Sequence, residues 1–452
     1  MEYKSTSLDE VQVLKLLEKR EYKELREELE NNIHPVDLAE MFDDFNPKQR
    51  VMIFRLLSKE EAAETFTNMN SDMREELINT LTDSELAEVM DEMYLDDTVD
   101  VLEEMPANVV DRLLLATDEG KRAQINLLLQ YPEDSAGSIM NVDYIAFRKE
   151  MTVQEAILKI RQVGLKRETI YTCYVTEKRR LIGIVDLKEL LTSSESKTVE
   201  EVMESNLQYA KTTDNQEEVA KTILKYGLMA LPILDHENCM VGLVTVDDAM
   251  QVLEEETTKD ISMMAGVSPN EESYFGTSIV QHVKSRIPWL LFLMLSATVT
   301  QMILNSYENA LAVMPQLAGF IPMLMGTGGN CGSQSSTLVI RGLAVGEISF
   351  RDIFKVMFKE VRVAVVISII LSVVNGIRII LMGQGDASLA LAIGLTMACT
   401  IIIAKMVGCT LPLLAKRIGL DPAIMATPLI STLVDISTVS VYFAIVSIMF
   451  NL

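Results

Sequence analysis

Long apolar stretches fill the last third of the chain, and they restrict its fold more than any other feature. A helix needs about 20 mainly apolar residues to cross the hydrocarbon core of a bilayer. Such stretches occur at about residues 287–306, 315–340, 361–382, 387–411 and 425–450. Because backbone polar groups must be satisfied inside lipid, we expect an all-α, five-helix transmembrane domain over residues 285–452.

Charge divides the chain at the same place. Residues 1–283 carry 29 basic and 58 acidic side chains, a net charge of −29, whereas residues 284–452 carry 11 basic and 7 acidic ones. Nucleic-acid phosphates would repel the acidic part, so no nucleic-acid partner is expected. Cations are its natural partners.

Basic residues also predict the orientation, because lysine and arginine concentrate in cytoplasmic loops. They lie before the first stretch, between the second and third, and between the fourth and fifth: Lys284, Arg286, Arg341, Arg351, Lys355, Lys359, Arg362, Lys416 and Arg417. The opposite loops, SYENALAV and GQGDAS, have none. The polar opening MEYKSTSLDEVQ is unlike a cleavable signal. We therefore expect a multi-pass protein of the cell (inner) membrane, with cytoplasmic N-terminal domains and the C-terminus outside.

Residues 1–132 repeat with a period of 24. Leu38-Ala39-Glu40, Ala62-Ala63-Glu64, Leu86-Ala87-Glu88 and Val110-Asp111-Arg112 begin equivalent segments with apolar residues at helical spacing. A fixed period of this length predicts stacked helix pairs, an α-helical repeat superhelix.

Residues 138–200 and 201–258 are a second duplication. Each half reads β–α–β–β–α, with strands such as IGIVD and GLVTV, and the halves resemble a tandem CBS pair of α+β fold. Such pairs often bind adenosine nucleotides, which implies an ATP site. The second copy, however, has no basic cluster that would hold phosphates, so the residues themselves do not support ATP binding. An acidic connecting helix, EEETTKDISMMAG, is expected within residues 254–280.

No arrangement of residues indicates an enzyme. The histidines His34, His236 and His282 lie in different regions, without a partner at ligand spacing. The glycine-rich segment 326–332 lies inside an apolar stretch and does not end in Lys-Ser/Thr, so it is not a phosphate loop. Two interpretations remain for it: close packing of helices through small residues, or irregular or exposed backbone that lines a water-filled path. The polar residues that follow favour the path, with Gly328 and Asn330 as lining candidates.

Asp435 is the most informative single residue. A carboxylate at the centre of a membrane helix costs about 2.5–3.5 kcal/mol on insertion scales, so it should face the bundle interior or water. Ser431 and Thr432 lie beside it. One interpretation is a hard oxygen site for Mg²⁺ or Ca²⁺. The other is a buried ion pair, for which Lys405 is the available partner.

From end to end, the chain resembles the MgtE family of magnesium transporters. Two segments carry the resemblance, PMLMGTGGNCGSQSSTLVIRGLA (322–344) and GLDPAIMATPLISTLVDIST (419–438). It implies a homodimer with a pore between the subunits and closure of that pore by cytosolic Mg²⁺. Asp435 matches the family's pore aspartate, and the resemblance implies pore-lining backbone near Ser431 and a metal contact at Asp421.

The resemblance also implies cytosolic Mg²⁺ sites in the N domain, the CBS pair and the connecting helix. The matching positions are Glu92, Asp96, Gly137, Glu217, Asp248, Glu256 and Asp260. The chain departs from the family pattern at Asn215, Leu224, Gly227 and Gln251, so the number of sensor sites stays open. A transporter of Ca²⁺, Co²⁺ or Mn²⁺ and a membrane-anchored nucleotide sensor are the alternative functions.

Overall fold

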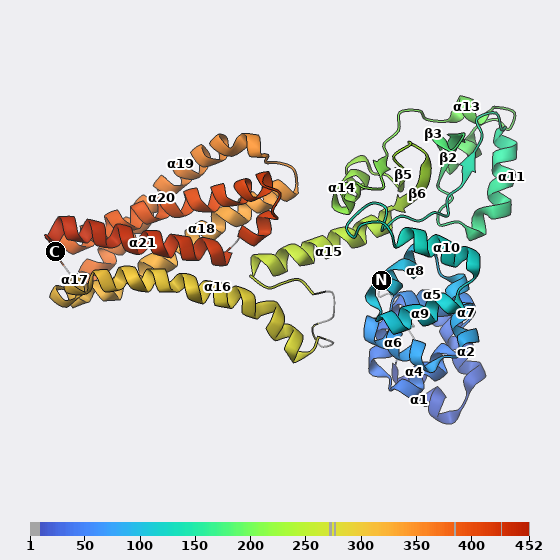
Figure 1. The fold of residues 1–452 in the computed structure, drawn as a ribbon, viewed down its shortest axis with the longest axis horizontal. Helices are drawn as coiled ribbons and strands as arrows, with labels where there is room; N and C mark the ends of the chain where they lie inside the picture. Colours follow the sequence, from blue (N-terminus) through green and yellow to red (C-terminus); the bar gives the residue numbers. More distant parts are fainter. Residues whose placement is uncertain (1–9, 271–273, 275–276, 384–385, 426, 452) are drawn as a thin grey trace, which may run out of the picture. The chain divides into compact units, whose positions relative to one another are not determined.

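The computed structural model describes residues 10–270, 274, 277–383, 386–425 and 427–451, and the chain divides into two compact units. Residues 1–255 contain the helical repeats and the CBS pair, and residues 256–452 contain the long apolar helices. Figure 1 shows this order along the chain. Each unit is described by itself below.

Short helices stack from Glu10 to Leu128, as the repeat in the sequence predicts. They are α1 (Glu10–Lys19), α2 (Tyr22–Asn32), α3 (Pro35–Met41), α4 (Pro47–Phe54), α5 (Lys59–Thr67), α6 (Ser71–Thr80), α7 (Asp83–Glu92), α8 (Leu95–Glu104), α9 (Ala107–Ala116) and α10 (Glu119–Leu128), with a 3₁₀ turn at Phe42–Asp44. The helices α3, α5, α7 and α9 begin at equivalent positions of successive repeats, and so do α4, α6, α8 and α10. The predicted helix pairs are confirmed.

Equivalent residues cap the helices and join the repeats. Ser58 and Thr82, which occupy the same position in successive repeats, each accept a hydrogen bond from the backbone N–H of the third residue that follows. Glu61 and Glu85 return the bond to complete capping boxes. Arg55 then donates to Glu85 of the next repeat, with 2.7 Å between Nε and Oε1. This bond, together with the Thr82 N–H, lowers the pKa of Glu85 to about 2.

The CBS pair has two three-stranded sheets with the predicted β–α–β–β–α order. The first repeat contains β1 (Ala146–Phe147), α11 (Val153–Val163), a 3₁₀ turn (Gly164–Lys166), β2 (Thr172–Glu177), β3 (Arg180–Asp186) and α12 (Leu187–Thr192). After α13 (Val199–Val202), the second contains β4 (Ala210–Lys211), α14 (Gln216–Tyr226), β5 (Ala230–Leu234), β6 (Met240–Thr245) and α15 (Val246–Met264). In each sheet a parallel pair is followed by an antiparallel pair, in the orders β1-β2-β3 and β4-β5-β6.

One hydrophobic core joins the helical repeats to the second CBS repeat. Leu102 and Leu128 of the repeats belong to the same buried cluster as Ile223 and Leu231 of the second CBS copy. The first CBS copy has a core of its own, which includes Phe147 and Val175. Helix α8 is therefore held by apolar packing in the body that also contains the start of α15.

The connecting helix differs from the predicted segment 254–280. Helix α15 already begins at Val246, so Asp248, Glu256 and Asp260 all lie on one helix, and it ends at Met264. Gly266 follows with a positive φ of 71°, and a Cβ there would lie 2.2 Å from Cδ1 of Trp289. The turn thus needs a glycine both for its conformation and for its contact with the tryptophan ring.

Long helices make up the second unit. They are α16 (Ile279–Ser306), α17 (Glu308–Val313), α18 (Ile321–Ala344), α19 (Ile353–Leu381), α20 (Ala387–Arg417) and α21 (Thr427–Phe450), with 3₁₀ turns at Pro315–Phe320, Phe350–Asp352 and Pro422–Met425. Helix α20 packs against α18, α19 and α21, and α16 packs along α21. Helices α18, α20 and α21 form the centre of the unit.

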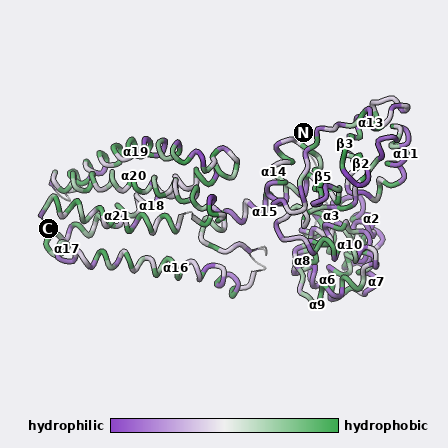
Figure 2. The backbone as a smooth tube through the Cα atoms, turned by 45° about the horizontal axis from the view of Figure 1, so that its top comes forward, coloured by the Kyte–Doolittle hydropathy of each residue, from purple (hydrophilic) through white to green (hydrophobic). Residues whose placement is uncertain are grey.

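Four helices of the described part are long and apolar enough to cross a membrane: residues 279–306, 350–381, 387–417 and 428–450. Five were predicted. The difference is α18, a continuous helix whose glycine, Asn330, Gln334 and serine residues reduce its mean hydropathy. Figure 2 shows the hydrophobic colour along α16, α19, α20 and α21. Large apolar side chains on α19, such as Val366, Ile370 and Val373, are exposed, as expected of a helix surrounded by lipid.

Glycines bring α18 and α20 into direct backbone contact. A Cβ added to Gly408 would lie 2.2 Å from the carbonyl oxygen of Gly332. A Cβ at Gly332 would meet Ile430 Cγ2 of α21 at 2.7 Å. Small residues of this kind allow membrane helices to approach each other closely.

We predict that Gly408→Ala destabilises the membrane unit by about 1–3 kcal/mol, because its methyl group must force α18 and α20 apart. The thermal midpoint and the monodisperse fraction of the detergent-solubilised protein measure this. Gly394→Ala, on the same helix, is the matched control, since its Cβ would meet Ser372 Cβ at an ordinary 3.6 Å. Equal midpoints for the two variants would contradict the packing argument.

Candidate cation sites

Asp435 lies half-buried in the middle turns of α21. Among the described residues its carboxylate makes no hydrogen bond or ion pair. The hydroxyl of Thr432, one turn earlier, donates to the carbonyl oxygen of Pro428 at 3.0 Å and does not approach the carboxylate as a donor. The carboxylate therefore keeps its full capacity to accept bonds from an ion or from water.

Lys405 is not the partner of Asp435. Its Nζ lies 3.3 Å from Glu360 Oε2 and 3.0 Å from Ser335 Oγ, and Ser335 Oγ donates to the same Glu360 oxygen at 2.5 Å. All three side chains are buried, with 3%, 9% and 0% of Lys405, Glu360 and Ser335 exposed. The ion pair that sequence reasoning considered for Lys405 thus exists, but with a carboxylate from α19.

The glycine-rich segment has regular helical backbone, so irregular backbone is wrong as one of the two forms, irregular or exposed, that the path interpretation allowed. Gly328 is buried, and a Cβ there would meet Thr400 Cγ2 at 2.6 Å and Val434 Cγ1 at 2.7 Å. This favours the packing interpretation at Gly328. Asn330, Gln334 and Thr337, in contrast, are exposed at successive helical positions on the other face of α18. A polar stripe of this kind is unfavourable in lipid.

A second group of carboxylates lies in the soluble unit, where α8 meets the CBS pair. The Asn141 side-chain amide donates to both oxygens of Asp96, at 3.0 Å each, and to Glu168 Oε2 at 2.8 Å. Asn141 is fully buried and Asp96 is 8% exposed. One neutral amide therefore holds two acidic side chains close together.

Burial and mutual repulsion raise the pKa values of these acids. Burial is the main cause for Asp96, Asp97 and Glu168, and the charge of Asp248 is the next cause for each. The pKa of Asp97 rises to about 6 and that of Glu168 to about 8, and the pKa of Asp96 is well above its usual value. Burial also raises the pKa of Asp248, although the hydrogen bond that the Thr245 hydroxyl donates to its carboxylate lowers it. Such a group favours either a proton or a bound cation.

The other predicted sensor residues have different surroundings. Glu92 is exposed at the end of α7, Glu217 pairs with Lys221, and Glu256 lies 3.2 Å from Lys259 on α15, on which Asp260 is half-buried. Gly137 is needed for packing, because a Cβ would meet Tyr131 Cγ at 2.5 Å. Asp421 Oδ1 accepts from the Ala423 N–H at 2.7 Å and begins the turn before α21.

As the side chains stand, no group of three or more His, Cys, Asp or Glu residues in the described part has the arrangement of a metal site. The charge of Asp248 acts on Asp96, so the fold brings these two predicted residues into one electrostatic group. Sequence reasoning missed Glu168, Asp97, Asn141 and Glu360. Only the placement of Asp97 next to Asp96 was a usable signal, since Glu168 and Glu360 lie among basic residues, in KRET and FKEVR.

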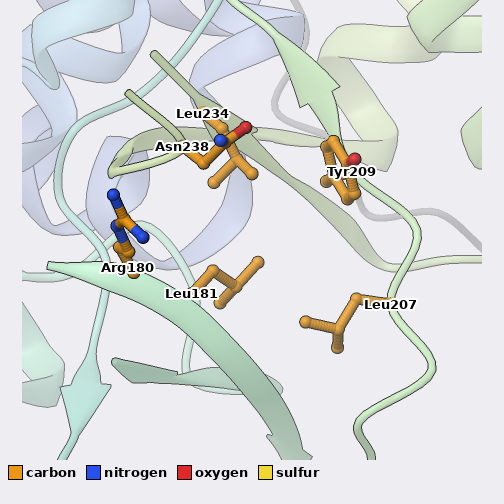
Figure 3. Close-up of a pocket in the computed structure, with 6 residues that line it drawn as sticks. All are labelled: Arg180, Leu181, Leu207, Tyr209, Leu234 and Asn238. Carbon is orange, nitrogen blue, oxygen red and sulfur yellow. The ribbon is translucent and has the colours of Figure 1, made fainter. Parts of the chain in front are cut away.

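A small pocket opens between the two CBS copies (Figure 3). It has a volume of about 180 Å³ and is lined by Arg180, Leu181, Leu207, Tyr209, Leu234 and Asn238. Pockets that enclose drug-sized ligands usually have about 300–1,000 Å³. This cavity alone is therefore too small for a whole nucleotide.

An acidic helical-repeat and CBS unit followed by apolar helices with buried charges defines a multi-spanning membrane protein with a large soluble unit. Family models match three parts of the chain: the divalent cation transporter model MgtE at residues 321–445, the MgtE intracellular N domain at 33–134, and the CBS domain at 136–196 and 199–255. The chain is 37% identical to the magnesium transporter MgtE of Thermus thermophilus over 444 residues, which are 96% of this chain and 97% of the relative. It is 29% identical to that of Bacillus subtilis, over 92% of each chain. The protein belongs to the MgtE family.

Solved structures agree with the fold of the soluble unit. The cytosolic domain of the Mg²⁺ channel MgtE, crystallised in complex with ATP, is 35% identical, with a TM-score of 0.52, and matches 54% of this chain and 100% of that domain. The soluble part of a magnesium transporter is 26% identical, with the same TM-score, and matches 55% of this chain and 97% of its own. The helical N domain followed by a CBS pair is confirmed.

We predict that, in a chelator, the fragment 1–260 loses at least about 1 kcal/mol of stability as the pH rises from about 5.5 to about 8.5. Folding raises the pKa of Asp97 to about 6 and of Glu168 to about 8. A carboxyl group whose pKa is higher in the folded than in the unfolded state stabilises the folded protein most at a pH below its pKa in the unfolded state. This stabilisation is lost as the pH rises through its pKa in the folded state. Urea unfolding at several pH values measures the effect.

Two controls belong to this experiment. The double variant Asp97→Asn, Glu168→Gln should show a smaller loss, and saturating Mg²⁺ should oppose the loss more strongly than NaCl of equal ionic strength. Glu85, with its low pKa, affects stability only in acid and does not interfere. A pH-independent free energy of unfolding would contradict the prediction.

Proposed function

We propose that the protein is a homodimeric Mg²⁺ transporter of the inner membrane, which carries Mg²⁺ into the cytoplasm and closes when cytosolic Mg²⁺ binds its acidic unit. The observation that carries the proposal is Asp435, a half-buried carboxylate without a protein partner in the described residues, while Lys405, a buried cation of the same unit, is paired with Glu360. Membership of a family of divalent cation transporters, and relatives named magnesium transporters, support it.

The arrangement suits a hydrated divalent cation. Mg²⁺ prefers oxygen ligands and gives up its water slowly, so one carboxylate from each subunit can hold the ion through its waters. The exposed stripe of Asn330, Gln334 and Thr337 supports a fifth span, α18, whose polar face is turned from lipid toward a water-filled path or a second copy. With five spans, the C-terminus lies outside. Ser431 and Thr432 are the proposed neighbours of the ion on α21, and Asp421 is a proposed contact near its cytoplasmic end.

We predict that Asp435→Asn reduces Mg²⁺ uptake into proteoliposomes at least about a hundredfold, because the variant keeps the shape of the side chain but removes the charge that offsets the cation's desolvation. A fluorescent Mg²⁺ indicator inside the vesicles measures the flux, normalised to monodisperse protein. Glu347→Gln, at an exposed loop position of the same unit, is the control. Uptake by Asp435→Asn at the parent rate would remove the basis of the proposal. Replacement of external Mg²⁺ by Ca²⁺, Co²⁺ or Mn²⁺ tests the alternative substrates.

Feedback follows from the electrostatics of the soluble unit. Residues 1–283 carry a net charge of −29 per subunit, which opposes compaction, and divalent cations that bridge carboxylates offset the repulsion. Asp96, Asp97, Glu168 and Asp248 are the proposed first ligands, because they already share one buried neighbourhood. Glu92, Gly137 and Glu217 of the same unit are further proposed ligands, as are Glu256 and Asp260 on the later turns of α15. Cations regulate the pore in this way only if the closed state binds them more tightly.

We predict that Asp248→Asn, Glu256→Gln and Asp260→Asn together remove inhibition by internal Mg²⁺ but leave uptake at low internal Mg²⁺ unchanged. All three residues lie on α15, away from Asp435 in the sequence, and their loss removes charge without removing bulk. Flux at a series of internal Mg²⁺ concentrations measures the inhibition. The control is the double variant Glu254→Gln, Glu255→Gln, at exposed positions of the same helix. It should keep the inhibition by internal Mg²⁺. An unchanged inhibition curve in the triple variant would mean that these carboxylates are only a solvated surface.

ATP binding by the CBS pair is a further part of the proposal. Its support is the relative's cytosolic domain, which was crystallised with ATP. The 180 Å³ pocket would have to widen or open into a neighbouring cleft to accept a nucleotide.

A further inference from the structure

Helices α18 to α21 contain two carboxylates, Glu360 and Asp435, and one buried cation, Lys405. Every other basic residue on these helices is exposed: Arg341, Lys355, Lys359, Arg362, Arg378, Lys416 and Arg417. A buried ammonium needs a carboxylate or water within reach. When one of the two carboxylates pairs with Lys405, the other is therefore left without a buried cation from these helices.

In the structure Glu360 pairs with Lys405, and Ser335 strengthens the pair. The hydroxyl of Ser335 donates to Glu360 Oε2 at 2.5 Å and accepts from Lys405 Nζ at 3.0 Å, while Nζ also lies 3.3 Å from that carboxylate oxygen. The group joins α18, α19 and α20. It directs the lysine toward α19 and satisfies its charge there.

Lys405 and Asp435 nevertheless begin from neighbouring points of the bundle. Helices α20 and α21 both pack on Gly332, where a Cβ would meet the Ala404 carbonyl oxygen at 3.3 Å and Val434 Cγ2 at 3.4 Å. Ala404 and Val434 directly precede Lys405 and Asp435. The lysine side chain has a flexible four-carbon stem, so its ammonium group can change position. If the Lys405 ammonium leaves Glu360, Asp435 is the one remaining carboxylate on these helices with which it can pair.

We propose that Glu360 is a positioning residue for transport, which keeps the Lys405 ammonium away from Asp435 so that Asp435 remains available to the transported cation. The inference rests on the proposed role of Asp435. Without Glu360, Lys405 becomes a tethered competitor for the ion site, at the high effective concentration of an intramolecular ligand.

This role has a kinetic signature. Two cations that exclude each other from one site are negatively coupled, and couplings of this kind usually change affinity by about 5- to 150-fold. Glu360→Gln should therefore raise the KM for Mg²⁺ about tenfold or more. A role in packing alone would lower the amount of folded protein or the maximal rate and leave KM unchanged.

The test measures Mg²⁺ uptake into proteoliposomes against external Mg²⁺ concentration, per monodisperse protein. The variants are Glu360→Gln, Lys405→Met, the double variant of the two, and Glu347→Gln as an exposed-carboxylate control. We expect the raised KM only in Glu360→Gln. Lys405→Met and the double variant should have the parent KM, because both lack the competing ammonium.

A parent-like KM in Glu360→Gln, or a KM that stays high in the double variant, would overturn the inference. If Glu360→Gln does not fold, Ser335→Ala weakens the pair without removing a charge, and it should raise KM only while Lys405 is present. The Asp435→Asn variant distinguishes a failure of the proposed ion site from a failure of the proposed role of Glu360. Parent-rate transport by Asp435→Asn overturns the proposed ion site itself, whereas its loss together with a normal Glu360→Gln overturns only the role of Glu360.

Discussion

A charge removed from water must find an opposite charge, a proton or an ion, and both candidate sites of this protein depend on that constraint. In the membrane unit, Glu360 satisfies Lys405, and breaking such a buried pair by removing one partner typically costs about 3–5 kcal/mol. Asp435 is left without a basic partner among the described residues. In the soluble unit, burial raises the pKa values of Asp96, Asp97 and Glu168, and the charge of Asp248 raises them further. At each site, carboxylates thus lack a full countercharge from the protein, and a bound cation can supply it.

Close packing gives these charges their geometry. The glycine contact between Gly332 and Gly408 brings α18 against α20, and this places Ser335, one turn along α18, within hydrogen-bonding distance of Lys405. In the soluble unit, the common core of the helical repeats and the second CBS copy holds α8 near the start of α15. Apolar and small residues therefore decide which charged groups meet, although they carry no charge themselves.

Local patterns predicted much of the fold. The period of the N-terminal repeats identified the helix pairs because each repeat has the same apolar positions and the same capping residues, as at Ser58 and Thr82. The duplicated β–α–β–β–α order was also readable, since its strands and helices differ in hydrophobic period. The count of spans was less secure. A span at 315–340 was predicted from its apolar residues, but the polar residues of α18 separate this helix from the four strongly apolar helices of the described chain.

The sequence by itself determined most of the helices, the strongly apolar character of α16, α19, α20 and α21, and that Asp435 is an unusual residue in such a helix, because these properties depend on local composition and spacing. Only the tertiary structure decided that Lys405 belongs to Glu360, and that Glu168 faces Asp96 across Asn141. Those partners lie 45 and 72 positions apart in the chain, and no local pattern encodes contacts at such separations. The free energy of a buried charge depends on what the fold places within a few ångströms of it, and packing alone sets that distance.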